Sequence, residues 1–136
     1  MPTWIKFAIV GVSGFAVDIT LFTALTAGLT LDYFVARALA FVAAASTTWI
    51  GNRLFTFAER QHGRASNQWR KALSAALMSA LPNFAVFSLA MMWFELVYLG
   101  PQLSLVLGIG AGTVSNFALS HFWVFKDRAE ERAQWT

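Results

Sequence analysis

Two long apolar segments make up most of the chain, and polar residues interrupt them at only a few places. The segments run over residues 7–52 and 72–125. A helix that crosses a bilayer needs about 20 mostly apolar residues, so each segment is long enough for two crossings joined by a short turn. The turns are expected at residues 28–33 and around 98–101. The pattern therefore predicts four helices, near residues 5–27, 34–57, 71–96 and 102–125.

The composition agrees with a membrane protein. The chain of 136 residues is 57% hydrophobic and 12% charged, whereas an ordinary soluble domain carries roughly 25% charged residues. We expect an all-α integral membrane protein in which residues 1–136 form a single four-helix domain. The first apolar run is similar to a signal peptide, but Asp18 lies in its middle and a second apolar run follows closely. We therefore expect the first helix to be retained.

Basic residues lie almost entirely outside the apolar segments. Nine of the ten Lys and Arg residues flank these segments, and Arg37 is the exception. The nine are Lys6, Arg53, Arg60, Arg64, Arg70, Lys71, Lys126, Arg128 and Arg132. Because short cytoplasmic loops are rich in Lys and Arg, both termini and the 58–70 loop are predicted to face the cytoplasm. Anionic lipid headgroups account for the basic balance, and no nucleic-acid partner is expected.

The two halves of the chain resemble each other at an offset of 68–69 residues. The tripeptide Phe-Ala-Val occurs at residues 15–17 and again at 84–86. Residues 48–57 (TWIGNRLFTF) are echoed by residues 116–125 (NFALSHFWVF). We expect one helical hairpin in each half, with repeat 1 at about 5–57, repeat 2 at about 71–125 and a cytoplasmic tail at 126–136. Since two spans return the chain to its starting side, the two repeats are predicted to have the same orientation.

Asp18 and Arg37 are the charged residues that a bilayer interior should reject. A charge at the bilayer centre costs about 2.5–3.5 kcal/mol on insertion scales, so it usually pairs with another group or faces a wet cavity. The two residues lie in adjacent antiparallel helices, with an axial offset of roughly 9 Å at 1.5 Å per residue. They either form an ion pair that holds the hairpin together, or Arg37 extends to the outer surface and leaves Asp18 for a substrate or a proton.

Uncharged polar residues and two further basic groups complete the candidate site. Besides the charged pair, the candidates are Asn52, Arg53, Asn83, Asn116 and His121. Such residues either hydrogen-bond between neighbouring helices or line a polar seam between the two hairpins. Arg53 and His121 occupy matching repeat positions, and Arg suits bidentate contacts with phosphate. A lipid phosphate is therefore a candidate ligand at this level of the membrane, beside ordinary headgroup contact.

Other features of the sequence bear on how the helices bend and pack and on which chemistry is expected. Pro82 removes a backbone donor and predicts a bend in the third helix. Gly108 and Gly112 form a GxxxG pair, which permits close helix packing within the fold or between protomers. The chain contains no Cys, and its sequence offers neither a nucleophile–base set nor a metal-binding cluster. We therefore expect no enzyme, no metal site and no cofactor.

Several of these motifs together resemble the GtrA-like family of small four-span membrane proteins. They are FAIVG at residues 7–11 followed by Asp18, Ala36-Arg37, WIGNRLFTF at 49–57, Asn116-Phe117 and Trp123-Val124-Phe125. The resemblance covers nearly the whole chain. It implies a role in cell-surface polysaccharide synthesis, in which a polyprenyl-phosphate-linked sugar moves from the cytoplasmic to the outer leaflet of a bacterial cytoplasmic membrane. It also implies that Asp18, Arg37, Asn52, Arg53, Asn83 and Asn116 match polar positions of the family.

The sequence departs from the family pattern at two positions. Gly14 stands where an Asn is common, four residues before Asp18, whereas the second repeat keeps its polar counterpart as Asn83. His121 stands where a basic residue is often Arg. These changes imply either an altered headgroup preference or specialisation of the two halves.

The leading hypothesis is a flippase for a polyprenyl-phosphate-linked monosaccharide, acting as a homo-oligomer because four helices enclose little volume. One alternative is a non-transporting adaptor that recruits a membrane glycosyltransferase through the basic 58–70 loop. Another is a small multidrug-type exporter, which shares four spans and an acid in the first helix. Such exporters usually lack a basic partner like Arg37, and the charge bias disfavours antiparallel dimers.

Overall fold

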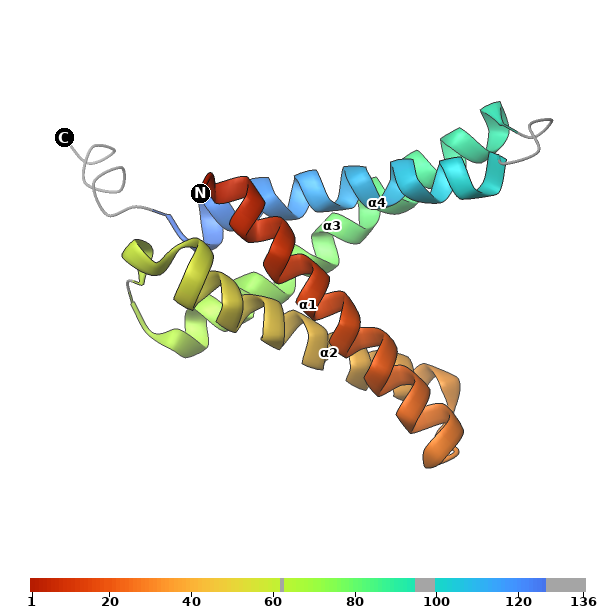
Figure 1. The fold of residues 1–136 in the computed structure, drawn as a ribbon, viewed down its shortest axis with the longest axis horizontal. Coiled ribbons are helices and arrows are strands. Elements are labelled where there is room, and N and C mark those ends of the chain that lie inside the picture. Colours follow the sequence, from red (N-terminus) through yellow and green to blue (C-terminus); the bar gives the residue numbers. More distant parts are fainter. Residues whose placement is uncertain (62, 95–99, 127–136) are drawn as a thin grey trace. The chain divides into compact units, whose positions relative to one another are not determined.

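The computed structural model describes residues 1–61, 63–94 and 100–126, and all regular structure in these ranges is helical. The prediction of an all-α protein is therefore confirmed. The α-helices are α1 (Thr3–Thr23), α2 (Tyr33–Gly51), α3 (Ala65–Trp93) and α4 (Gly100–Leu119) (Figure 1). Shorter helical turns are η1 (Ala24–Gly28), η2 (Asn52–Thr56), η3 (Ala58–Arg60) and η4 (Ser120–Val124).

Within these ranges, three helical segments are long and apolar enough to cross a membrane. They are Thr3–Gly28, Ala65–Trp93 and Leu103–Val124. α2 is not among the three segments found within the described residues. The chain is thus a membrane protein with several apolar helices. Four crossings and cytoplasmic termini stay predictions.

The chain folds as two compact units, residues 1–73 and residues 74–126. The expected single four-helix domain, with two repeats in the same orientation, stays a prediction. In the first unit, α1 and α2 form a hairpin with extensive mutual contact, and η2 also packs on α1 (Figure 1). The second unit holds most of α3 together with α4 and η4.

Small residues let α1 and α2 approach each other closely. A Cβ added to Gly14 would collide with Cγ2 of Thr48 and lie 3.3 Å from the carbonyl oxygen of Ala44. One helical turn from Gly14 along α1, Val10 would lie 2.7 Å from a Cβ on Gly51. The hairpin is therefore held by close backbone approach, which is the usual way in which helices associate in lipid.

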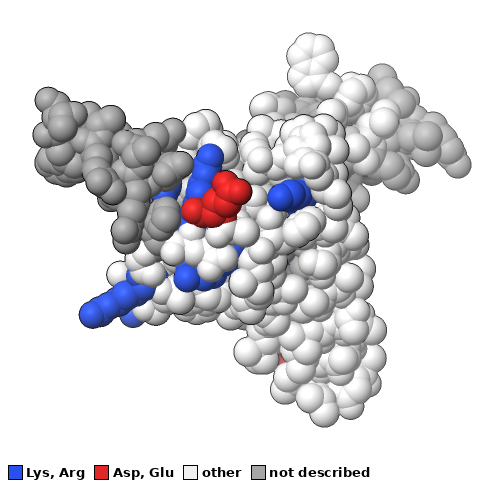
Figure 2. All heavy atoms as spheres, turned by 60° about the vertical axis from the view of Figure 1, so that its left-hand side comes forward, with Lys and Arg blue, Asp and Glu red and all other residues white. Residues whose placement is uncertain are grey.

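Many large apolar side chains of the first hairpin face outward. Examples are Val12, Phe15, Ile19, Val35, Leu39 and Ile50, each between 47% and 69% exposed. In contrast, the fully buried apolar residues of α2 are the small Ala36 and Ala40. An exposed apolar surface of this extent is costly in water and favourable against lipid tails. Large areas of the described surface in Figure 2 carry no charged side chain.

In the second unit, glycines of α4 fit against α3. A Cβ on Gly108 would lie 2.8 Å from the backbone oxygen of Asn83, and a Cβ on Gly112 would lie 2.8 Å from Cβ of Asn83. The GxxxG pair therefore serves packing within the fold. By contrast, Gly110 has no atom within 4 Å of an added Cβ. The close approach of the two helices centres on Asn83, the residue that follows Pro82 within α3.

The hairpins end in the same kind of turn at matching positions. η2 and η4 are both five-residue π-helical turns, and their first residues lie 68 residues apart. The N–H of Phe57 donates to the Asn52 carbonyl at 2.7 Å, and the N–H of Phe125 donates to the Ser120 carbonyl at 2.8 Å. Both phenylalanines are buried, at 3% and 1% exposure. Hydropathy did not indicate these turns, since a π-turn changes the backbone bonding without changing residue polarity.

α3 begins at Ala65, six residues before the predicted span near 71. Its first turns are polar, with Gln68, Arg70 and Lys71 among them. Hydropathy marks the apolar part of a helix and misses polar turns that precede it. Residues 98 and 99 of the second predicted turn lie outside the described residues, and its other two residues begin α4. The tail at 127–136, with two Arg residues, also lies outside them.

Candidate functional site

Asp18 of α1 and Arg37 of α2 form an ion pair inside the first hairpin. Nη1 of Arg37 donates to Oδ2 of Asp18 at 2.7 Å. Of the two arrangements that the sequence allowed, the structure contains the direct pair. Asp18 and Arg37 lie on the two adjacent helices of one antiparallel hairpin. The long side chain of Arg37 spans the axial distance between them.

The pair is unequally exposed. The side chain of Asp18 is 17% exposed and that of Arg37 is 58% exposed. Oδ1 of Asp18 is buried, and no hydrogen-bond partner for it occurs in the described part of the chain. A carboxylate oxygen left without a donor in an apolar hairpin is unfavourable. The guanidinium uses one nitrogen on Asp18, and its side chain is otherwise largely exposed, so the arrangement can accept a further anionic or hydroxyl group.

Arg53 lies at the opposite end of α2, in the π-turn η2. Its Nη1 donates to Oε1 of Gln68, which also accepts from Nε1 of Trp49 at 3.3 Å. The guanidinium carbon of Arg53 lies 6.0 Å from the centre of the Trp49 ring. Gln68 is buried, at 5% exposure. Arg53 therefore has a structural partner, while its phosphate-binding role stays a prediction.

Asn52 supports the same turn from inside. It is 4% exposed, and its Oδ1 accepts from the hydroxyl of Thr56 at 2.8 Å. Its backbone oxygen accepts the N–H of Phe57 that closes the π-turn. This amide is thus occupied in shaping the end of the hairpin. Thr56 and Phe57, which it holds, line the pocket described below.

Residues that the sequence placed in a loop fasten α3 to the first hairpin. Besides Gln68, Trp69 donates from Nε1 to the hydroxyl of Ser46 at 2.9 Å. Sequence reasoning missed Gln68 as a site residue. The signal in the sequence was Trp69, a large aromatic residue that lies next to Gln68 in a segment otherwise rich in basic residues.

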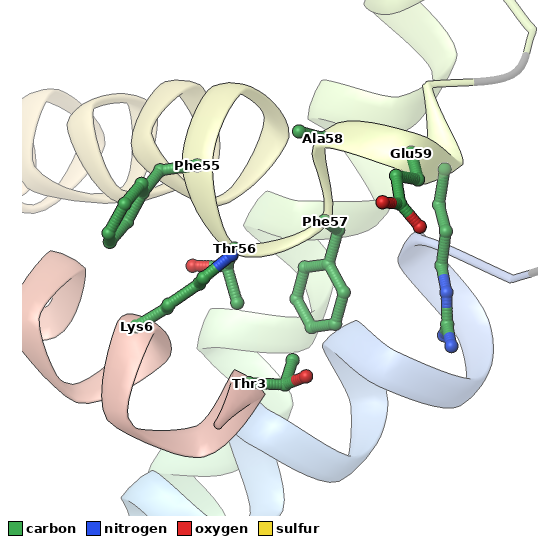
Figure 3. A pocket seen from close by; sticks show the side chains of 8 residues that line it. Thr3, Lys6, Phe55, Thr56, Phe57, Ala58 and Glu59 are labelled. Atoms are coloured by element: carbon green, nitrogen blue, oxygen red, sulfur yellow. The ribbon is translucent and has the colours of Figure 1, made fainter. Parts of the chain in front are cut away.

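A polar pocket of about 260 Å³ opens where the N-terminal turns of α1 meet the end of η2. Thr3, Lys6, Phe55, Thr56, Phe57, Ala58, Glu59 and Arg60 line it. Lys6 extends from α1 towards Thr56, and Glu59 lies beyond the Phe57 ring in the view of Figure 3. Nζ of Lys6 lies 5.2 Å from the Phe55 ring centre, and the guanidinium carbon of Arg60 lies 5.9 Å from that of Phe57.

The candidate residues of the second unit lie on α3, α4 and η4. Asn83 is half-buried against Gly108 and Gly112 of α4. Asn116 is half-buried on α4. His121, in η4, packs its ring against Phe117 at 5.8 Å and Phe122 at 4.7 Å between centroids. The polar seam that would join these residues to those of the first unit stays a prediction.

The first unit therefore holds two basic groups far apart along one continuous helix. Arg37 and Arg53 are separated by sixteen residues, or about 24 Å at 1.5 Å per residue. This separation approaches the hydrocarbon thickness of a bilayer, about 30 Å. No group of three metal-binding side chains occurs among the described residues.

Comparison with protein-family models gives a match that covers most of the chain. The family model described as GtrA/DPMS, transmembrane domain, matches residues 6–125. A search of curated proteins found no match. The matched range includes both hairpins and every candidate site residue, and it confirms the resemblance inferred from the motifs. The chain therefore belongs to the GtrA/DPMS transmembrane-domain family.

Proposed function

We propose that the protein moves a polyprenyl-phosphate-linked monosaccharide across a bacterial cytoplasmic membrane for cell-surface polysaccharide synthesis. Membership of the GtrA/DPMS family supports involvement in polyprenyl-phosphate sugar translocation in general. The flippase role, the bacterial membrane and the four crossings with cytoplasmic termini are part of this proposal. A non-enzymatic role agrees with the transport-related character of the family.

The single observation that carries the proposal is the Asp18–Arg37 pair. Two charges are kept within a hairpin whose other outward residues suit lipid, and such intramembrane charges usually mark a substrate or ion path. Arg37 remains 58% exposed although it is paired. It can therefore exchange its remaining donors between Asp18 and a passing phosphate or sugar hydroxyl without a fully unpaired intermediate.

The two ends of α2 suit a substrate with a polar head and an apolar tail. Arg53 and the pocket with Lys6 lie at one end, and Arg37 lies about 24 Å away along the helix. A sugar phosphate that left the basic end would meet its next cationic partner at Arg37. The polyprenyl tail would stay in lipid against the apolar outer faces of α1 and α2. A homo-oligomer would enclose the path, and a membrane glycosyltransferase would supply the substrate.

The test is transport in proteoliposomes that contain the purified protein and a short-chain fluorescent polyprenyl-phosphate glucose. An Arg37→Ala variant should lower the transport rate at least about tenfold, the effect of losing one charge-assisted hydrogen bond worth roughly 1.5–3 kcal/mol. Arg64→Ala, which removes an exposed charge outside the hairpin, should transport normally. Normal transport by a well-incorporated Arg37→Ala protein would remove this residue from the mechanism.

The same assay separates transport from recruitment. An adaptor would show no transport by the wild-type protein in vesicles, and substitutions in the basic 58–70 loop would abolish polysaccharide export in cells. A flippase would transport in vesicles without any partner protein. Loop substitutions would then leave the vesicle rate unchanged.

A further inference from the structure

The polar pocket at the end of the first hairpin is separate from the Asp18–Arg37 pair that carries the transport proposal. It lies entirely within residues 3–60, and its volume of about 260 Å³ is just below the roughly 300–1,000 Å³ of pockets for drug-sized ligands. The size fits the head of a lipid rather than a large cofactor. Thr3 and Lys6 come from α1, and the remaining lining residues come from the segment 55–60.

The charges around this pocket are available to a ligand. Lys6 and Arg60 both line it, and neither forms an ion pair within the described residues. Each is instead placed over an aromatic ring, Lys6 over Phe55 and Arg60 over Phe57. A cation over a ring face is stabilised without using its hydrogen-bond donors on another acceptor. Two cations therefore face the pocket with unused donors.

The pocket also contains an acceptor and a hydroxyl. Glu59 lines it, and like the two cations it forms no ion pair in the described parts of the chain. Thr3 adds a hydroxyl group at the other side. A bare phosphate would meet repulsion from Glu59, whereas a phosphate ester that bears hydroxyl groups could donate one to this carboxylate. The lining therefore selects a phosphate attached to a polyol.

The position of the pocket identifies the source of such a phosphate. It lies at the end of the hairpin that carries Lys6, Arg53 and Arg60, directly beyond the apolar part of α1 and α2. Headgroups occupy this level of a bilayer, and clustered basic side chains there attract anionic lipids. Trp4, which is 63% exposed in the first turn of α1, has the amphipathic ring typical of membrane interfaces.

We propose that the pocket lined by Lys6, Glu59 and Arg60 binds the phosphate ester headgroup of a hydroxyl-bearing lipid. The phosphate contacts the two cations, and a hydroxyl of the attached glycerol or sugar donates to Glu59. The shared chemistry covers an anionic phospholipid such as phosphatidylglycerol and a polyprenyl-phosphate sugar. A phospholipid bound here need not cross the membrane, whereas the binding of a polyprenyl-phosphate sugar rests on the proposed transport function.

Occupancy can be measured with a single engineered thiol, because the chain has no Cys of its own. Ala58 is exposed and lines the pocket, so Ala58→Cys reports on it, and the exposed Ser66→Cys on α3 is the matched control. Thiol labelling of the full-length protein in detergent is followed with short-chain phosphatidylglycerol, short-chain polyprenyl-phosphate glucose, phosphatidylcholine or inorganic phosphate. At a probe concentration about ten times its dissociation constant, a bound probe should slow labelling of Ala58→Cys about tenfold.

The expected result is protection of Ala58→Cys, but not Ser66→Cys, by at least one hydroxyl-bearing phosphate lipid and not by phosphatidylcholine. Protection by the phospholipid, by the sugar lipid or by both identifies the source. Equal slowing at both cysteines, protection by phosphatidylcholine, protection by inorganic phosphate alone, or no protection by any lipid would overturn the proposal.

Charge variants test the assigned residues. Lys6→Gln with Arg60→Gln should weaken the binding of the protecting lipid at least about tenfold, because both charge-assisted contacts with the phosphate are lost. The matched pair Arg64→Gln with Lys71→Gln removes the same charge from exposed positions outside the pocket and should retain protection. Equal loss in both pairs would mean non-specific attraction and would contradict the site. Lys6→Arg with Arg60→Lys keeps both charges and should still bind the protecting lipid. Its binding shows that substitution at these two positions does not by itself disrupt the pocket.

Discussion

The two hairpins make the same close helix crossing with opposite partners. At the level of this crossing in the first hairpin, the small residue is Gly14 on α1, and it faces Ala44 and Thr48 on α2. In the second hairpin the small residues are Gly108 and Gly112 on α4, and they face Asn83 on α3. Gly14 and Asn83 lie 69 residues apart, and Ala44 and Gly112 lie 68 apart, which is the offset of the sequence repeat. The two hairpins therefore cross at matching positions. The glycine lies on the first helix in one hairpin and on the second helix in the other.

The two hairpins also differ in their polar residues. The first hairpin carries Asp18 and Arg37, whereas residues 74–94 and 100–125 contain no Asp, Glu, Lys or Arg. The second hairpin keeps an amide, Asn83, at the crossing, where the first has only backbone and Thr48 around Gly14. The halves thus share a packing plan, and the charged chemistry belongs to one of them.

The largest effect should come from removing both charges of the first hairpin together. Asp18→Leu with Arg37→Leu leaves no unpaired charge in the hairpin, and apolar side chains at both positions avoid the cost of a charge in the bilayer. The double variant should unfold in detergent at or above the wild-type temperature, yet lose transport at least about tenfold. Transport at the wild-type rate would make the pair a purely structural contact. A strongly destabilised double variant would contradict its assignment to function.

A matched alanine series on the second hairpin should give the next largest effect. In Gly108→Ala the new Cβ lies 2.8 Å from a backbone oxygen that cannot rotate away, so we expect a loss of about 1–3 kcal/mol in the free energy of unfolding. Gly110→Ala has open space around its Cβ and should be neutral or stabilising. Thermal unfolding in one detergent measures both. Equal stability of the two variants would mean that the crossing in the second hairpin is looser than described.

The attachment of α3 to the first hairpin should contribute less. Gln68→Ala removes the acceptor of Trp49 and Arg53, whose half-exposed donors can turn to water, so a loss of about 0.5–1.5 kcal/mol is expected. Gln61→Ala, an exposed residue that donates to the Arg53 carbonyl, is the control and should cost less. Hydrogen exchange at residues 65–73 measures the local effect. Unchanged protection there would show that these contacts do not hold the start of α3.

The smallest net effect is expected at Gly14, and it tests the difference between the two crossings directly. Gly14→Ala meets Cγ2 of Thr48, and the off-rotamer strain of roughly 0.5–1.5 kcal/mol nearly cancels the gain of about 1 kcal/mol in helix propensity. Thr48→Ser removes that methyl group and keeps the hydroxyl, so Gly14→Ala should become stabilising in this background. If Gly14→Ala lowers the free energy of unfolding as much as Gly108→Ala does, the two crossings are equally rigid. The proposed difference between the hairpins would then be wrong.

Much of the fold follows from residue polarity along the chain. The helices around residues 5–27, 34–57 and 102–125 were predicted within a few residues, because apolar length sets where a helix is favoured in lipid. The Asp18–Arg37 pair was one of two predicted arrangements, since spacing from a turn fixes the level of each residue. Gln68 and the early start of α3 were missed because polar turns have no hydropathy signal.

The sequence by itself determined the apolar helices and the family of this protein, and it predicts two repeated hairpins. The tertiary structure decided which glycine faces which helix, that Asn52 and Ser120 begin π-turns, and that Lys6 and Arg60 share one pocket with Glu59. Composition and residue spacing predict helices and turns within one segment of the chain at a time. Close backbone approach and a shared pocket depend on the rotation of helices about their axes, which only packing against a neighbour fixes.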